Sequence, residues 1–315
     1  MQKEIKEISP WGVQAPFLAL SVTYFALSLI KLVMHDFSDH AYFAMIATYA
    51  MLYGMLLRLF FPATKYLPAH LIALIAIAIP FPASQAVSAL AVTVAEAWGL
   101  KDVKSYGSKF PVNYLVLSSP PAGIIAWLAF YFTGNFTFLI PPVVLYVLGI
   151  NVGVFAATLR SKPFFGKRQL PFLLLSVLSF LKPIYALDVL AYSGYVLSKV
   201  RNFKTPSSLV LVSFLMSSVT ALFINFVHSV MLGLMLPSFI NCVVYSIARY
   251  NYGNKPHQLS LVLIFMSLIA WEPLKAVSVI LTLLALLIFY ALIVHNFYPR
   301  AVKLGISVKF LREAK

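Results

Sequence analysis

The chain has 315 residues, of which 61% are hydrophobic and only 10% are charged, and its mean hydropathy is +0.90. A soluble domain carries about 25% charged residues because its surface must stay hydrated. The composition therefore excludes a soluble enzyme and a disordered regulator, and it requires lipid around the chain. A chain of this length provides roughly ten to twelve spans of ~20 residues each.

The charge is strongly basic, with 24 Lys and Arg against 9 Asp and Glu and a net charge of +15. In a soluble protein this excess would indicate nucleic acid. In a membrane protein it indicates basic cytoplasmic loops and contact with anionic lipid headgroups, so we expect membrane lipid and no nucleic acid as a partner. The single cysteine, Cys242, excludes an intramolecular disulfide and a cysteine cluster, and we interpret it as a packing residue.

Apolar runs between breakers predict an all-α, polytopic membrane bundle. The first run, Phe17–Met34, is too long for the core of a signal peptide and is interpreted as the first membrane segment. In chain order the expected segments are 12–34, 41–57, 66–80, 84–100, 111–132, 136–159, 169–182, 184–199, 206–226, 229–248, 258–271 and 275–297.

Four of these segments are short for a full crossing, and they form two pairs. The first pair is interrupted at Pro80-Phe81-Pro82 and the second at Lys182-Pro183. Each pair is either one long kinked helix or a tight helical hairpin. The alternatives give about ten or twelve membrane segments.

The basic residues distinguish these alternatives. With two hairpins, both termini are cytoplasmic, and all Lys and Arg except Lys31, Lys182 and Lys275 lie on the cytoplasmic side. With two kinked helices, Lys182 is placed inside the membrane and the basic residues divide more evenly. The positive-inside rule favours twelve segments, some of which do not span fully.

No segment is long and polar enough to fold as a soluble domain. We therefore predict one transmembrane domain over residues 1–315 in the cell membrane, with multi-pass segments within 12–297 and short cytoplasmic tails at 1–11 and 298–315. There is no linker, no low-complexity tract and no strong internal repeat. The hairpins at 66–100 and 169–199 suggest a repeat only faintly.

Ionisable residues near the membrane gather on the outer side of the twelve-segment topology. They either mark the wet ends of helices or form an outward polar face for a substrate, a quinol or a partner protein. We call this set the outer patch: His35, Asp36, Asp39, His40, Lys182, Asp188, His228, Glu272 and Lys275.

The densest part of the outer patch is the stretch from His35 to His40. Two histidines and two carboxylates could bind a divalent metal, but the spacing matches no metal motif, and a capped turn before the next helix is the simpler interpretation. No metal site is predicted. Glu96 could carry a proton or extend to the inner headgroups, and we favour the second. No histidine lies in mid-span, so the chain gives no positive signal for a heme of its own.

One resemblance is to the polytopic glycosyltransferases that use polyprenyl-phosphate sugars. It rests on Asp36 and Asp39 with Tyr42, then Phe110-Pro111-Val112-Asn113-Tyr114 with Pro120-Pro121, then Lys182-Pro183. The resemblance implies that Asp36 or Asp39 is the catalytic base and that lysines hold phosphate. The large outer loop of that family is absent from this sequence.

The whole-chain profile is similar to the CbsB subunits, the small hydrophobic subunits of the b-type cytochrome complex of thermoacidophilic archaea. Length, about ten predicted spans, the lack of soluble loops and the single cysteine carry this resemblance. It implies a membrane subunit of an archaeal respiratory chain that partners an outward-facing, heme-bearing subunit in electron transport. The heme is expected on that partner, no cofactor is predicted on this chain, and quinol is a further candidate partner.

A third hypothesis is a small-solute transporter, which would typically show related repeats or interrupted helices in corresponding halves. An enzyme would need an ordered polar pocket above the membrane. A subunit that works with a partner needs neither, so a non-catalytic subunit of an electron-transfer complex fits the sequence best.

Overall fold

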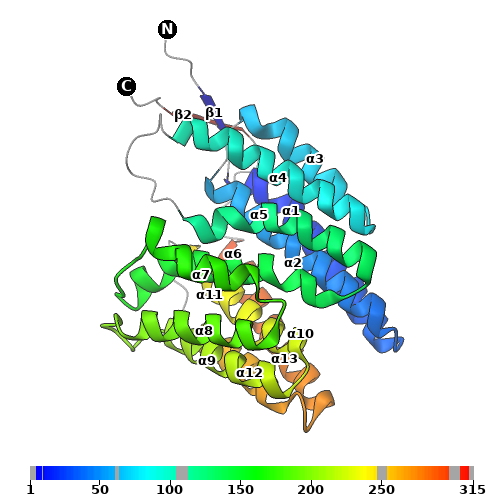
Figure 1. Ribbon diagram of the computed structural model, residues 1–315, viewed down its shortest axis with the longest axis vertical. Helices are drawn as coiled ribbons and strands as arrows, with labels where there is room; N and C mark the ends of the chain where they lie inside the picture. Colours follow the sequence, from blue (N-terminus) through cyan, green and yellow to red (C-terminus); the bar gives the residue numbers. More distant parts are fainter. Residues whose placement is uncertain are drawn as a thin grey trace. The chain divides into compact units, whose positions relative to one another are not determined.

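The computed structural model describes residues 5–8, 10–60, 64–103, 113–246, 254–297 and 306–311. Nearly all of the described chain is helical, which confirms the all-α membrane bundle (Figure 1). The helices form two compact units: unit 1 is Met1–Val112, Leu117–Val143 and Val302–Lys315, and unit 2 is Asn113–Val116 and Val144–Ala301. The single transmembrane domain stays a prediction.

Unit 1 contains five helices, the beginning of a sixth and a small sheet. Most of its helices begin at or near a proline or an aromatic residue, where the chain leaves a short turn. In order the elements are β1 (Ile5–Ile8), α1 (Pro10–Val33), α2 (Phe37–Phe60), η1 (Thr64–Tyr66), α3 (Leu67–Ile77), α4 (Pro82–Val103), α5 (Tyr114–Thr133), η2 (Phe136–Leu139), the first turn of α6 (Ile140–Thr158) and β2 (Ile306–Leu311).

Unit 2 contains the rest of α6 and the remaining helices. One expected segment, 229–248, is divided by a π-helical turn, which widens the helix locally. In order the elements are η3 (Gly166–Gln169), α7 (Leu170–Val177), α8 (Lys182–Leu197), α9 (Ser207–Phe223), α10 (Phe226–Val230), the π-helical η4 (Met231–Met235), α11 (Leu236–Ser246), α12 (Asn254–Ala270) and α13 (Lys275–Phe297).

The strands β1 and β2 were not expected from the sequence, which predicted two short tails. They pair antiparallel, with Ile5 opposite Leu311 and Ile8 opposite Ile306. Because this pairing joins the two ends of the chain, it supports the expectation that both termini lie on one side of the membrane. The side itself stays a prediction.

Six of the described helices are long and apolar enough to cross a membrane, and they make the chain a multi-pass membrane protein. Three further apolar helices are shorter: Thr64–Ile77, Ser207–Phe223 and Pro256–Ala270. The six long ones are Gly12–Val33, Phe37–Arg58, Tyr114–Thr133, Phe136–Thr158, Phe226–Val243 and Lys275–Leu292.

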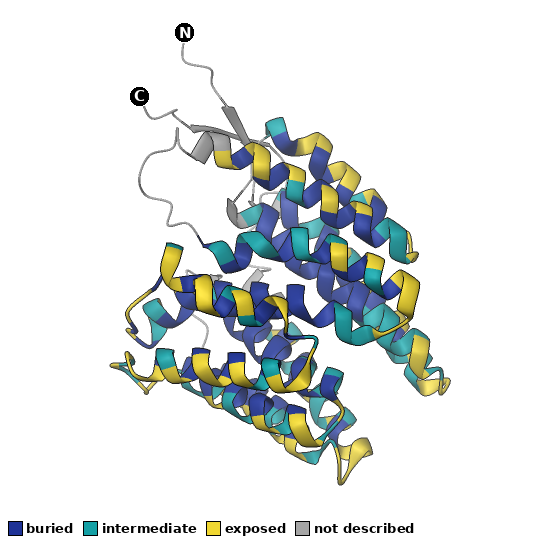
Figure 2. Cartoon of the chain, viewed as in Figure 1, coloured by how far each residue is buried: buried dark blue, intermediate teal, exposed yellow. Residues whose placement is uncertain are grey.

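The helix surfaces are apolar outside and partly polar inside. On α4, Val87, Leu90 and Val94 are exposed, whereas Gln85 and Ser88 are fully buried (Figure 2). A soluble protein would place these residues the other way round. The exposed aliphatic faces therefore require lipid, and the buried amides and hydroxyls join helices to one another.

The first short pair is a hairpin of two helices, α3 and α4. The chain breaks at Pro80, and side chains at the start of α4 return to the free carbonyls of α3. Ser84 Oγ donates to Ala76 O at 2.6 Å, and Ser88 Oγ donates to Ala73 O at 2.8 Å. Gln85 Nε2 donates to the carbonyl groups around the break, Ile77 O and Ile79 O. These bonds satisfy backbone carbonyl groups that would form hydrogen bonds with water in a soluble protein.

The second short pair is also a hairpin, formed by α7 and α8. The turn between them continues in tight i to i+3 bonds, such as Ser179 N to Ser176 O at 3.1 Å. The eight residues of α7 rise only about 12 Å, well short of the ~30 Å hydrocarbon core. The hairpin predicted for each pair is confirmed, and α7 is too short to cross alone.

The two hairpins share a pattern of prolines. Both first helices begin with Leu-Pro after a 3-10 turn, and a second proline follows at the same spacing: Pro68 and Pro80 in one, Pro171 and Pro183 in the other. Counted from the helix starts, several buried positions of α4 and α8 coincide, among them Ser88 and Asp188, although the prolines align Asp188 with Gln85. Ser88 and Asp188 each form a hydrogen bond with the first helix of their hairpin.

The helices that follow the hairpins repeat as well. α5 and α9 are each followed by Asn-Phe, and both asparagines, Asn135 and Asn225, cap the next helical segment with their side chains. A buried asparagine then follows at the same spacing, Asn151 in α6 and Asn241 in α11. The segments α3–α6 and α7–α11 therefore share one order of elements: a short hairpin, a helix, and a helical segment capped by an asparagine.

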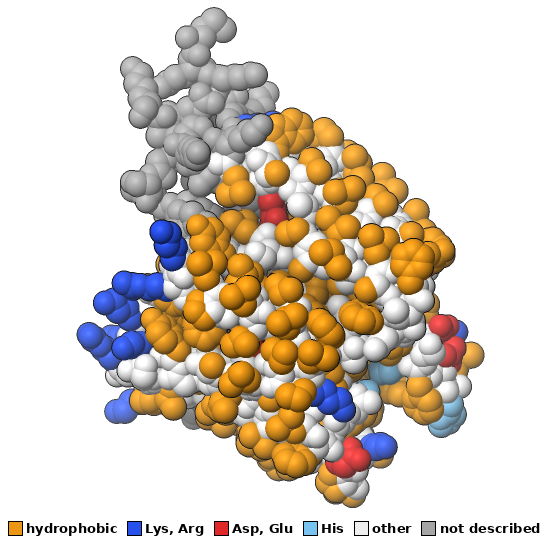
Figure 3. Space-filling view, in the orientation of Figure 1, with side chains coloured by type: hydrophobic (Ala, Val, Ile, Leu, Met, Phe, Trp, Pro, Cys, Tyr) orange, Lys and Arg blue, Asp and Glu red, His pale blue; other side chains and the backbone are white. Residues whose placement is uncertain are grey.

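The charges of unit 2 separate along its helices. Seven basic residues, all exposed, lie in the loops beside the ends of α6 and α8 and the starts of α7 and α9 (Figure 3). We call these loops the basic end of unit 2. We call the opposite end of the unit, which contains the turns before α8, between α9 and α10 and between α12 and α13, the distal end. The basic residues are Arg160, Lys162, Lys167, Arg168, Lys199, Arg201 and Lys204.

Close approach of α6 to the start of α5 depends on Gly149. A Cβ atom at this position would lie 2.6 Å from Val116 Cγ2 and 2.7 Å from the backbone Val116 N. Gly149→Ala is expected to lower the free energy of unfolding by roughly 1–3 kcal/mol, because backbone must shift to relieve the overlap. Thermal unfolding in mild detergent measures this.

Gly153→Ala is the matched control on the same helix, because no atom lies within 4 Å of an added Cβ there. It should leave the protein unchanged or slightly more stable, since alanine favours helix over glycine. Equal destabilisation by both substitutions would contradict the packing assigned to Gly149.

The membrane orientation is testable with single cysteines at the two ends of unit 2. Lys162→Cys at the basic end is expected to react with an impermeant maleimide only from the cytoplasmic side, and Glu272→Cys only from the outside. Native Cys242 is buried and should give little background. Labelling of both positions from one side would contradict the twelve-segment topology.

Candidate functional site

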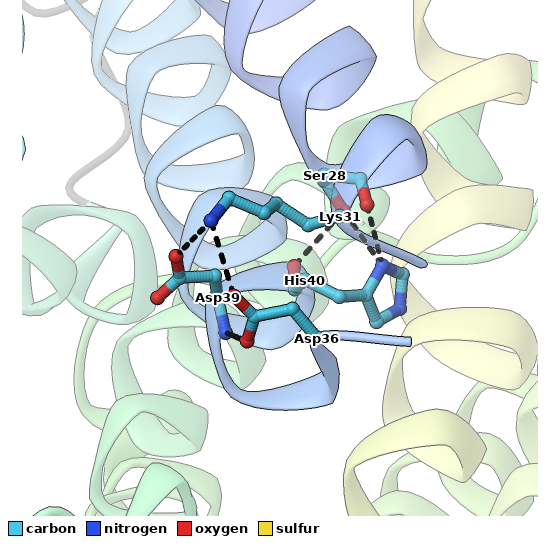
Figure 4. A network of polar contacts seen from close by, with 5 residues as sticks. All are labelled: Ser28, Lys31, Asp36, Asp39 and His40. Carbon is cyan, nitrogen blue, oxygen red and sulfur yellow. Dashed lines mark hydrogen bonds and ion pairs between the residues drawn. The ribbon is translucent and has the colours of Figure 1, made fainter. Parts of the chain in front are cut away.

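The stretch from His35 to His40 contains the turn between α1 and α2 and the first turn of α2. Lys31 Nζ lies 3.1 Å from Asp36 Oδ2 and 2.6 Å from Asp39 Oδ2 (Figure 4). His35 occupies the left-handed region, with φ at 60°, where the chain reverses direction. One lysine therefore holds both carboxylates of this stretch.

Asp36 also caps α2. Its Oδ1 accepts a hydrogen bond from Asp39 N at 3.2 Å, which satisfies a free N–H at the helix start. This bond and the Lys31 ammonium group lower the pKa of Asp36 below its ordinary value. A carboxylate stabilised in this way is a poor base, so the geometry gives the catalytic role of Asp36 no support, and that role stays a prediction of the resemblance alone. Of the residues on which the resemblance rests, Phe110-Pro111-Val112 lie outside the described chain.

His40 belongs to the same structural turn. Ser28 Oγ lies 3.0 Å from His40 Nδ1 and donates to His40 O at 2.9 Å. These contacts tie the end of α1 to the start of α2. The capped turn expected at this place is therefore what the structure contains (Figure 4).

The rest of the outer patch lies in unit 2, and most of it is brought together at the distal end. His228 stacks on Trp271 with ring centroids 3.7 Å apart, which joins the start of α10 to the end of α12. Tyr185 packs against Phe226 at 5.2 Å, which joins α8 to α10. Lys182, Glu272 and Lys275 are exposed at the start of α8, just after the end of α12 and at the start of α13.

Asp188 does not belong to this exposed group. It lies more than a turn inside α8 and is fully buried, with 0% of its surface exposed. Ser176 Oγ donates to its Oδ2 at 2.6 Å, and its Oδ1 has no hydrogen-bond partner among the described residues. The sequence placed Asp188 at the outer edge because its position in the chain is near Lys182, but the face of α8 that carries it points inward.

Glu96 is the buried acid of unit 1. We expected it to extend to the headgroups, but only 4% of its surface is exposed and its Oε1 has no hydrogen-bond partner among the described residues. It lies near Tyr53 of α2, with which it interacts electrostatically. The neighbouring Trp98 is the exposed residue of this turn. The expectation for Glu96 was therefore wrong.

Within the described chain, no group of three or more His, Cys, Asp or Glu side chains is arranged to hold a metal ion. For the two acids that are buried in the described chain, the only signal in the sequence was their position inside apolar helices. Among the described groups, Asp188 is the most informative candidate, because a buried carboxylate with one hydrogen bond needs a further compensating group.

Comparison with protein families, curated proteins and solved structures finds no match to this chain.

The turn between α1 and α2 predicts a pH-dependent stability. Because the pKa of Asp36 is lowered in the folded protein, its charge stabilises the fold above the ordinary Asp range and ceases to do so as the pH falls through the lowered pKa. Asp36→Asn keeps the cap and removes the charge. It is expected to be less stable than the native protein at neutral pH, with the difference vanishing in acid.

Melting temperatures of the two proteins across acidic to neutral pH measure this difference. Glu272→Gln is the control, since Glu272 is exposed and forms no ion pair with another described residue. If the melting temperature of Asp36→Asn differed from that of the native protein by the same amount at every pH, or by the same amount as Glu272→Gln, the stabilising role assigned to the Asp36 charge would be contradicted.

Proposed function

We propose that the chain is the membrane subunit of a respiratory electron-transfer complex, similar to the CbsB subunits, and that it docks a heme-bearing subunit at the distal end of unit 2. The observation that carries this proposal is the composition of that end. Lys182, Glu272 and Lys275 are exposed there, and none of them forms an ion pair with another described residue. Unpaired charges of both signs are available for complementary charges on a partner.

Exposed apolar side chains support the same proposal. Leu181 and Leu274, which directly precede Lys182 and Lys275 in the chain, are exposed, and Phe223 at the end of α9 exposes 79% of its surface. Exposed apolar groups next to charges are typical of a protein interface, which has an apolar centre and a polar rim. The two carboxylates at the α1–α2 turn are neutralised by Lys31 and contribute less to such a surface.

The heme of this complex is expected on the partner subunit. On this chain, His228 is stacked on Trp271, and His40 is bonded to Ser28 at the turn. Both histidines are thus engaged by neighbouring side chains, which supports the placement of the heme on the partner subunit. Quinol stays a candidate partner near the same end.

A transporter is the second candidate function, and the repeated hairpins favour it. Transporters are commonly built from structural repeats with short or interrupted helices, and their ion sites lie in those helices. The α3–α4 and α7–α8 hairpins have this form, and Asp188 lies in one of them. Substrate uptake by proteoliposomes containing this chain alone would favour this function over the first.

The docking proposal is tested by purifying the protein from its own membranes in mild detergent. The native chain is expected to co-purify with heme absorbance at a fixed ratio. A variant with Lys182→Glu, Glu272→Lys and Lys275→Glu should lose most of that heme, because reversed charges repel the partner. Absence of heme from the native preparation contradicts the proposal.

Charge reversal at the basic end is the matched control. Lys162→Glu and Lys199→Glu change charges of the same kind on the same unit, away from the proposed surface. They should leave the heme ratio unchanged. Equal loss of heme from both variants would show that the effect is not specific to the distal end.

A further inference from the structure

We propose that Asp188 is a proton-exchanging carboxyl group inside unit 2, connected to the distal end by a chain of hydroxyl groups. The inference does not rest on the electron-transfer function. It begins from the geometry of the carboxyl group, which is fully buried, accepts one hydrogen bond from Ser176 and leaves Oδ1 without a partner. Either a proton or a metal cation must compensate such a charge in apolar surroundings.

Among the described residues, no basic side chain forms an ion pair or a hydrogen bond with Asp188. From α7 it faces the Ser176 hydroxyl, and from its own helix it faces Tyr185 and Tyr192, each about one turn away on the same side. Asp188 forms no ion pair with any described residue. Since no lysine, arginine or histidine of the described chain neutralises it, a mobile proton is the simplest compensating group.

A set of hydroxyl groups leads away from this carboxyl group. Tyr185 Oη lies 2.6 Å from Ser217 Oγ on α9, and Ser217 Oγ donates to Ser229 O at 2.8 Å. Ser229 Oγ in turn donates to Ser217 O at 3.0 Å and lies 2.6 Å from Thr220 Oγ1. We call Tyr185, Ser217, Ser229 and Thr220 the hydroxyl ladder.

The hydroxyl ladder runs from the buried acid toward the distal end. Tyr185, Ser217 and Ser229 are fully buried, whereas Thr220 is half-buried and lies one turn from the end of α9. Tyr192, on the other side of Asp188, donates instead to the backbone carbonyl of Leu148 at 2.7 Å. The two tyrosines therefore differ in what they connect, and only Tyr185 belongs to the ladder.

Proton movement along the hydroxyl ladder needs no co-reactant. Within each hydroxyl pair, Tyr185 with Ser217 and Ser229 with Thr220, one O–H bond breaks and another forms, and the electron pair stays on the oxygen that gives up the proton. Between the pairs, the Ser217 and Ser229 hydroxyls each donate to the other's backbone carbonyl, so transfer from one to the other requires both hydroxyls to rotate. The step from the carboxyl group to the Tyr185 hydroxyl requires a side-chain rotation, because these groups are not hydrogen-bonded in this conformation. The serine and threonine hydroxyls can then reorient, since each is both donor and acceptor.

Infrared spectroscopy of the full chain in lipid tests the carboxyl group directly. The native protein is expected to show a C=O band of a protonated carboxyl group that diminishes as the pH rises, and Asp188→Asn should remove it. Glu96→Gln, which changes the other buried acid, should retain it. Ser176→Ala removes the hydrogen bond and should shift the frequency of the band without abolishing it.

Exchange into heavy water tests the route. The Asp188 band should shift on transfer to D2O, and Tyr185→Phe should slow this shift by about an order of magnitude, because the first hydroxyl of the ladder is lost. Tyr192→Phe is the matched control and should exchange at the native rate. Equal rates in both variants would overturn the route through the ladder.

Two further outcomes would overturn the assignment of the proton. One is the absence, at every pH, of a protonated-carboxyl band that depends on Asp188. The other is a band that disappears in sodium but not in potassium, which would assign the carboxyl group to a sodium ion. Neither outcome depends on heme co-purification, so this proposal and the proposed function can fail separately.

Discussion

The need to satisfy backbone carbonyls where helices break in an apolar environment determines much of this structure. In lipid no water is present to bond a free carbonyl, so a break within a membrane segment needs a polar side chain nearby. At the α3–α4 hairpin this need is met by Ser84, Gln85 and Ser88. In the α7–α8 hairpin, Asp188 takes the place of Ser88 when the two helices are aligned at their starts, and it accepts a hydrogen bond from a serine. A contact made by a hydroxyl group in one hairpin is therefore made by an ionisable group in the other.

Hydroxyl groups supply most of the polar contacts between helices, and charges supply few. Ser267 and Ser278 bond to each other across α12 and α13 at 2.7 Å, and Ser260 Oγ donates to Ala285 O at 2.8 Å. Such bonds within membranes contribute on average only about 0.6 kcal/mol each. Their small side chains also allow helices to approach closely, so packing and hydrogen bonding act at the same places.

The sequence predicted the helical segments well because apolar length and proline breaks are local properties. All twelve expected segments correspond to helical segments, and both short pairs are hairpins. It could not predict which face of a helix points inward, and for that reason Asp188 and Glu96 were placed at the membrane edges. The pairing of β1 with β2 joins residues from opposite ends of the chain, and no local sequence pattern predicts it.

The candidate site was predicted only in part for the same reason. The distal end of unit 2 gathers Lys182, His228 and Glu272 as the topology suggested, since helix ends of one polarity meet there. The acids of the α1–α2 turn were recognised as a cluster, but their neutralisation by Lys31 depends on side-chain geometry. The repeat of α3–α6 in α7–α11 became recognisable once helix starts and buried faces could be aligned, because few identical residues carry it.

The orientation of α8 is the central claim of this account, since the buried acid and its hydrogen bonds depend on it. It is tested most directly by nitroxide labels at Leu187→Cys and Val189→Cys, with Cys242→Ala to remove the native thiol. The label at 187 should collide freely with oxygen dissolved in lipid, because Leu187 is exposed, and the label at 189 should be protected, because Val189 is fully buried. Equal or reversed oxygen accessibility would contradict the inward orientation of Asp188.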